Sequence, residues 1–221
     1  MMVFFVWYPA PLSKAMGVIQ LFFILVIADV VLGPLLGLMV YKEGKETLKF
    51  DLFVVILIQI CALSYGIYTI AQGRPAWIVY DGLNFIVVKN NDIENKDIQN
   101  TDPRFQHPSF FRPQFVATQT SSITSQKQFL DYTQKQQVSA ITRYPIFYVE
   151  LVDVKARLQL AAMPLFVLDQ FNDKNRVAMI LHEYPKADAW VALSAPIQDM
   201  VVLINKEKGE VVKIVDLRPW K

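Results

Sequence analysis

Residues 17–40 read GVIQLFFILVIADVVLGPLLGLMV, an apolar run whose one formal charge is the carboxylate of Asp29. As a helix, this run would be about 36 Å long, which exceeds the roughly 30 Å hydrocarbon core of a bilayer. A second apolar run, LFVVILIQICALSYGIYTIA, occupies residues 52–71 and also has the length of a membrane span. The sequence therefore predicts a helical hairpin within residues 17–72, made of two transmembrane helices.

Asp29, Gly33 and Gly37 are spaced by four residues, so they are expected on one face of the first of these helices. The two glycines have the small-xxx-small spacing that lets membrane helices approach closely. Pro34 removes one helical hydrogen bond, which predicts a local kink. This face has the features of a helix-packing surface.

The second helix is expected to present a facing seam of small and polar residues, Gln59, Ala62 and Gly66. Counting from the connector puts Asp29 level with residues 62–65, so the Tyr65 hydroxyl is a candidate hydrogen-bond partner. A carboxylate in mid-membrane is costly and usually faces protein or water. Asp29 is then either a pairing site for another membrane helix, part of an ion path, or a group satisfied internally by Tyr65, Ser64 or backbone freed by Pro34. The first and last of these are favoured because there are few other intramembrane polar groups.

The basic residues around the hairpin predict its orientation. Lys42, Lys45 and Lys49 lie in or beside the connector, against Lys14 and Arg74 at the two opposite ends. The positive-inside rule then puts the connector in the cytoplasm and everything after residue 72 on the outer side.

Residues 1–10, MMVFFVWYPA, are apolar but too short to span a bilayer. Trp7 and Tyr8 stand where an aromatic belt would lie, and Pro9 and Pro11 follow. We interpret this segment as the end of a first, apparently truncated membrane helix. Either this short stub packs beside the other helices, or the true start of the protein lies upstream of Met1. Residues 12–16 are expected to form a loop.

The remaining residues, 73–221, have the composition of one folded aqueous domain. The chain is 53% hydrophobic with a mean hydropathy of +0.29, which fits a membrane hairpin joined to such a domain. Residues 1–72 hold four basic and four acidic residues, and the rest hold eighteen and sixteen. Since no basic stripe with interleaved aromatics occurs, nucleic acid is not expected as a partner.

An α+β fold with an antiparallel sheet and one or two helices on a face is predicted for this domain. A hairpin is expected where two β-rich runs, 76–80 and 85–89, flank Asp81-Gly82-Leu83-Asn84. Residues 90–125 are expected to be irregular, and the periodic residues of 125–142 and 165–184 predict helices. The other strands are expected at 146–154, 190–193, 200–204 and 211–217.

Sequence motifs for catalysis or metal binding are missing. The chain has one cysteine, Cys61, and two histidines, His107 and His182, without ligand spacing. Neither a nucleophile elbow, a phosphate-binding loop nor a dinucleotide fingerprint occurs. We therefore predict a protein with no cofactor, no metal and no catalytic residues. The alternative is a membrane-anchored enzyme, although acidic candidates such as Asp81, Asp97 and Asp102 are scattered over turns.

Four stretches resemble the TfpX/TfpZ family of type IV pilin accessory proteins. They are FFVWYPAPL at 4–12, ADVVLGPLLGLMVY at 28–41, AQGRPAWIVYDGLNFIVV at 71–88 and LSAPIQDMVVLINKEKGEVVKIVDLRPW at 193–220. The resemblance implies a Gram-negative, multi-pass inner-membrane protein with a periplasmic C-terminal domain, encoded beside the pilin whose assembly it assists. It also implies a longer first helix preceded by basic residues, from which this chain departs by starting near Phe4. The implied partners are the type IV major pilin, through its membrane helix and head, the lipid bilayer and other pilus assembly proteins. With this resemblance, the enzymatic alternative becomes a membrane-anchored enzyme that modifies the pilin, for example by glycan transfer.

Overall fold

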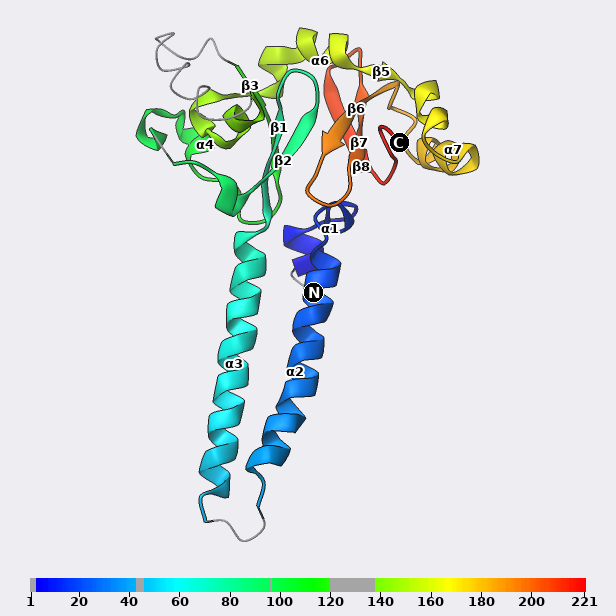
Figure 1. The fold of residues 1–221 in the computed structure, drawn as a ribbon. Helices are drawn as coiled ribbons and strands as arrows, with labels where there is room; N and C mark the ends of the chain where they lie inside the picture. The colour runs from blue at the N-terminus through cyan, green and yellow to red at the C-terminus, as the bar shows by residue number, and fades with distance from the viewer. Residues whose placement is uncertain (1–2, 43–45, 96, 120–137) are drawn as a thin grey trace.

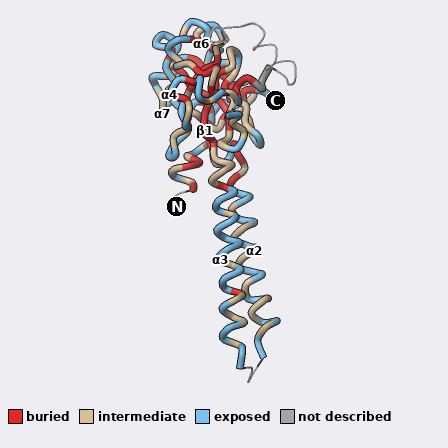
Figure 2. Tube along the Cα trace, turned by 90° about the vertical axis from the view of Figure 1, so that its left-hand side faces the viewer, coloured by how far each residue is buried: buried red, intermediate tan, exposed pale blue. Residues whose placement is uncertain are grey.

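Two long helices project from a sheet domain in the computed structural model, which describes residues 3–42, 46–95, 97–119 and 138–221 (Figure 1). Helix α2 spans Val18–Val40 and helix α3 spans Leu48–Gln72. Both are long and apolar enough to cross a membrane. Most of their side chains are exposed in the isolated chain, as the pale blue shafts of Figure 2 show. This is the expected surface of helices whose surroundings are lipid, and the predicted hairpin is confirmed.

Among the described residues, the sheet has eight strands in the order β4-β3-β1-β2-β6-β7-β8, with β5 paired to β6. Their bounds are Pro75–Tyr80 (β1), Phe85–Lys89 (β2), Gln114–Thr118 (β3), Tyr148–Val149 (β4), Met163–Pro164 (β5), Ala189–Ser194 (β6), Met200–Asn205 (β7) and Glu210–Val215 (β8). The predicted hairpin of β1 and β2 is confirmed, with Tyr80 opposite Phe85. The antiparallel run β6-β7-β8 is also confirmed.

The sheet is mixed, and it differs at two pairings from the antiparallel sheet that the sequence predicts. Strand β3 pairs in parallel with β1, and β6 pairs in parallel with β2. Long connections make this possible, because parallel neighbours need a crossover rather than a tight turn. Strand β3 itself lies inside the 90–125 stretch that the sequence predicts to be irregular.

Short helical elements complete the domain. They are Val3–Trp7 (η1), Leu12–Ala15 (α1), Asn90–Asp92 (η2), Ile98–Asn100 (η3), Pro103–Gln106 (α4), Val138–Arg143 (η5), Pro145–Phe147 (η6), Leu151–Val154 (η7), Lys155–Ala161 (α6), Leu165–Gln170 (η8) and Lys174–Glu183 (α7). The loop predicted at 12–16 is mostly the short helix α1. The strand predicted at 146–154 is wrong except for β4, because the chain turns there into η7 and α6. Most of the helix predicted at 125–142 lies outside the described residues.

Each face of the sheet carries its own hydrophobic core, as strand alternation requires. One face carries two clusters. In the first, Trp190 and Leu203 of the sheet pack with Val177 of α7. In the second, beside β1 and β3, Trp77 packs with Phe105 of α4. The opposite face is the larger core, and it encloses the N-terminal segment. The sheet curves around that segment as a half-barrel, so that β1, β3 and β8 all border the pocket beside Pro11.

Candidate functional site: the membrane hairpin and its junction with the sheet

Helices α2 and α3 are in close contact at two glycines. A Cβ built on Gly33 would stand 2.1 Å from Nε2 of Gln59, and one built on Gly66 would stand 1.7 Å from Cδ1 of Leu25. Each glycine therefore receives a side chain from the opposite helix, as small residues do in membrane helix pairs. Gly33, Gln59 and Gly66, three of the residues expected to face each other, thus do so within the hairpin.

Asp29 lies between these two contacts. It is four residues after Leu25 and four before Gly33, so it shares the α2 face that meets α3. Interpolation between the contacts puts it level with Ala62 and Leu63. Its side chain is half-buried, and within the described residues it makes no hydrogen bond or ion pair.

The pairing of Asp29 with the Tyr65 hydroxyl, expected from the sequence, is not formed. Tyr65 is 72% exposed, and its hydroxyl makes no hydrogen bond to the described residues, whereas its carbonyl accepts one from the hydroxyl of Thr69. Ser64, the other hydroxyl considered, donates to the carbonyl of Ile60 in its own helix, at 2.7 Å. The carboxylate is therefore paired with neither of these two hydroxyls.

Other residues of the expected packing surface lie away from close contacts. Gly37 has open space around the position of a Cβ, so α3 does not approach it closely within the hairpin. Pro34 and Ala62 are exposed, and α2 continues as a helix through Pro34. The close glycine contacts of the hairpin therefore lie around the middle of α2, from Leu25 to Gly33.

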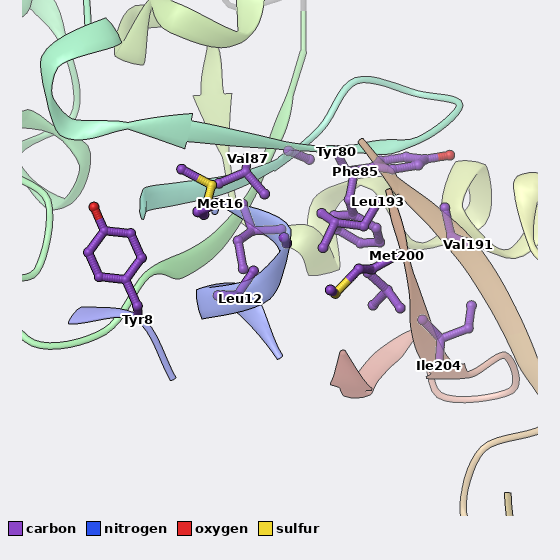
Figure 3. Packing of buried hydrophobic residues seen from close by; sticks show 14 of the residues in the cluster. Tyr8, Leu12, Met16, Tyr80, Phe85, Val87, Val191, Leu193, Met200 and Ile204 are labelled. Carbon is purple, nitrogen blue, oxygen red and sulfur yellow. The ribbon is translucent and has the colours of Figure 1, made fainter. Parts of the chain in front are cut away.

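The N-terminal segment joins the hairpin to the sheet. Leu12 and Met16 are buried in the same cluster as Val87 and Leu193 (Figure 3). The hydroxyl of Tyr8 donates to the carbonyl of Ile70 near the end of α3, at 2.9 Å. The segment expected to be the end of a membrane helix is a π-helical turn that packs against α3 and the sheet domain.

The junction is also fixed through the backbone. The carbonyl of Ala15 accepts hydrogen bonds from the amides of Ile197 and Gln198, in the connection between β6 and β7. Gly17, which links α1 to α2, has φ +68° and lies against Ile197. A side chain is strained at this φ, so glycine suits the turn at which the membrane helix begins.

A cluster of ion pairs around Asp216 also connects the N-terminal segment to the sheet domain. The Asp216 carboxylate binds Lys14 at 2.7 Å, Arg176 at 2.9 Å and Arg218. Burial alone would raise the pKa of Asp216, but the hydrogen bond from Lys14 and the charges of Arg218, Lys14 and Arg176 lower it below its ordinary value. Sequence reasoning missed this cluster, because Lys14, Arg176 and Asp216 are far apart in the chain.

The closing D-L-R-P-W stretch has a structural role here. The indole of Trp220 donates to the carboxylate of Asp199, at 2.9 Å, and Arg218 donates to the Asp199 carbonyl. These bonds hold the C-terminal residues against the β6–β7 connection, beside the N-terminal segment.

The acidic residues considered for catalysis occupy turns. Asp81 accepts from the amides of Leu83 and Asn84 in the β1–β2 turn, and Asp102 caps α4 and pairs with Arg104. Asp97 has φ +60° at the start of η3. Among the described residues, no three of His, Cys, Asp and Glu are grouped as metal ligands would be.

The fold and its junction define a membrane protein in which a helical hairpin carries a curved mixed sheet. Over 94 residues, or 42% of this chain, it is 38% identical to the fimbrial assembly protein of serogroups C1 and C2 of Dichelobacter nodosus, and the match covers 72% of that protein. The chain belongs to this family of fimbrial assembly proteins.

Two longer relatives match as well. They are the fimbrial assembly proteins of serogroups I and E1 of the same organism, 37% and 36% identical over 94 residues. The match spans 37% of the length of each. No protein-family profile and no solved structure matches the chain.

Proposed function

We propose that this protein is a non-catalytic accessory protein of type IV pilus assembly, of the TfpX/TfpZ kind, that assists a cognate major pilin. Support comes from the names of its relatives and from its two membrane helices. We place it in the inner membrane, with residues 17–72 as a two-helix unit and residues 73–221 as a periplasmic domain beside the pilin head. The lysines around the α2–α3 connector support this orientation.

The observation that carries the proposal is the carboxylate of Asp29, which has no hydrogen-bond or ion-pair partner among the described residues although it lies midway along a membrane helix. Intramembrane carboxylates usually pair with another polar group. We propose that the membrane helix of the pilin supplies this group, by docking across the α2–α3 seam. Gly33 would not provide the docking surface, because Gln59 already fills the space over it.

The test replaces Asp29 by Asn and by Leu in cells that make the protein at normal levels. Both substitutions remove the charge, and Leu also removes the acceptor, so we expect fewer surface pili and weaker co-purification with the pilin, most strongly for Asp29→Leu. Ser64→Ala is the matched control, since Ser64 bonds within its own helix. Normal piliation and normal pilin recovery in both Asp29 variants would remove Asp29 from the mechanism.

A further inference from the structure

A groove of about 390 Å³ opens where the membrane hairpin meets the sheet domain. Leu21 and Leu25 of α2 form one wall, and Tyr65 and Ile70 of α3 form the other. The groove extends along the helices only as far as Leu25 and Tyr65, so it ends about one turn before Asp29. It is therefore separate from the carboxylate discussed above.

The walls of the groove belong to the segments that are apolar enough to cross a membrane. Leu21 is 59% exposed and Tyr65 is 72% exposed in the isolated chain. In a bilayer, these surfaces are in contact with hydrocarbon rather than water. Because water is unfavourable there, the groove requires an apolar occupant.

The end of the groove next to the sheet is polar. Lys89 and Asn91 border it there, just beyond the last turn of α3. The Lys89 ammonium lies 3.4 Å from the Asp92 carboxylate, longer than the roughly 2.7–2.9 Å of a strong charged hydrogen bond. An ammonium group has three donors, so Lys89 can also bind an anionic oxygen at the mouth of the groove.

We propose that this groove binds one phospholipid from the leaflet beside the sheet domain. Its acyl chain lies between Leu21, Leu25 and Ile70, and its phosphate is bound by Lys89. Apolar walls at membrane depth and a cation at the membrane surface match the two parts of such a molecule in position and in charge. The proposal needs only insertion of the hairpin in a membrane, and so it is independent of any contact with a pilin.

The first test measures lipid retention. The full chain is reconstituted with phosphatidylglycerol, extracted in mild detergent and examined by native mass spectrometry. We expect one retained lipid. Leu21→Trp fills the groove and should lower the retained fraction at least fivefold, whereas Leu38→Trp, at another exposed α2 position outside the groove, should leave it unchanged. Lys89→Gln should lower retention, and Lys186→Gln, outside the groove, should not.

A second measurement needs no variant. A phosphatidylglycerol with a photoreactive group on its acyl chain is cross-linked to the wild-type protein in vesicles, and the modified peptides are identified. We expect the modified positions to concentrate at the groove. Even labelling along α2 and α3, no retained lipid, or equal losses in the groove and control variants would overturn the proposal. Retention of diacylglycerol as strong as that of phosphatidylglycerol would overturn the role given to Lys89.

Discussion

The ammonium of Lys14 and the carboxylate of Asp216 lie 2.7 Å apart although 202 residues separate them in the chain. Lys14 belongs to α1, just before the first membrane helix, and Asp216 directly follows the last strand. The pair therefore connects the entry to the membrane with the far edge of the sheet. Together with the Ala15 bonds to the β6–β7 connection, it fixes the orientation of the hairpin relative to the domain.

Replacing Asp216 by Asn should destabilise the junction. Lys14, Arg176 and Arg218 would lose their shared counter-charge, and because the cluster is only partly buried we expect a cost of about 1–3 kcal/mol at neutral pH. Thermal unfolding of the detergent-solubilised protein measures this. Asp169→Asn provides a carboxylate control, and an equal loss in both variants would contradict a special role for Asp216.

The same substitution predicts a pH dependence. The folded-state pKa of Asp216 is lowered, so its contribution to stability is fully present above its unfolded pKa of about 3.9. This contribution is lost as the pH falls through the lower folded-state value. The stability difference between wild type and Asp216→Asn should therefore be constant near neutral pH and shrink below about pH 4. A difference that grew on acidification would contradict this assignment.

Gly66→Ala should destabilise the hairpin, whereas Gly37→Ala should not. A methyl group on Gly66 meets Leu25, whose displacement should cost about 1–3 kcal/mol, whereas the space over Gly37 is open. Alanine also favours a helix over glycine by about 0.5–1 kcal/mol, so Gly37→Ala should be neutral or stabilising. Comparing the melting temperatures of the two variants in one detergent tests this, and equal effects would show that the Gly66 contact is not tight.

Leu12→Ala should destabilise the sheet domain as a core substitution does. Leu12 is 2% exposed within the largest hydrophobic cluster, so we expect a loss of about 2–5 kcal/mol. Leu38→Ala removes the same atoms from an exposed position of α2 and should have little effect. Denaturant unfolding followed by tryptophan fluorescence compares them. A small effect of Leu12→Ala would mean that the N-terminal segment is not part of the core.

Tyr8→Phe should loosen the contact between the N-terminal segment and α3. It removes the hydrogen bond to the Ile70 carbonyl and little else, with an expected cost of about 1 kcal/mol. Tyr41→Phe, at an exposed residue after α2, is the control. Hydrogen exchange near the end of α3 should rise in the first variant only.

Local patterns account for the parts of the fold that could be predicted. The two apolar runs predict α2 and α3, and the Asp81-Gly82-Leu83-Asn84 turn predicts the β1–β2 hairpin, because each signal lies within a few neighbouring residues. Strand β3 was missed because Gln114–Thr118 is short and follows a Pro-rich stretch. Its parallel pairing with β1 depends on a long-range crossover, for which the sequence has no local signal.

The candidate site divides in the same way. The sequence alone determined that Asp29 lies in a membrane helix and that Gly33 and Gln59 belong to facing surfaces, because helical periodicity and span length follow from residue order. Only the tertiary structure decided that Gln59 occupies the space over Gly33 and that the space over Gly37 is open. It also decided that Tyr65 borders a groove instead of binding Asp29. It also brought the N-terminal segment, Arg176 and Asp216 together. These outcomes depend on packing between segments far apart in the chain, which no local pattern encodes.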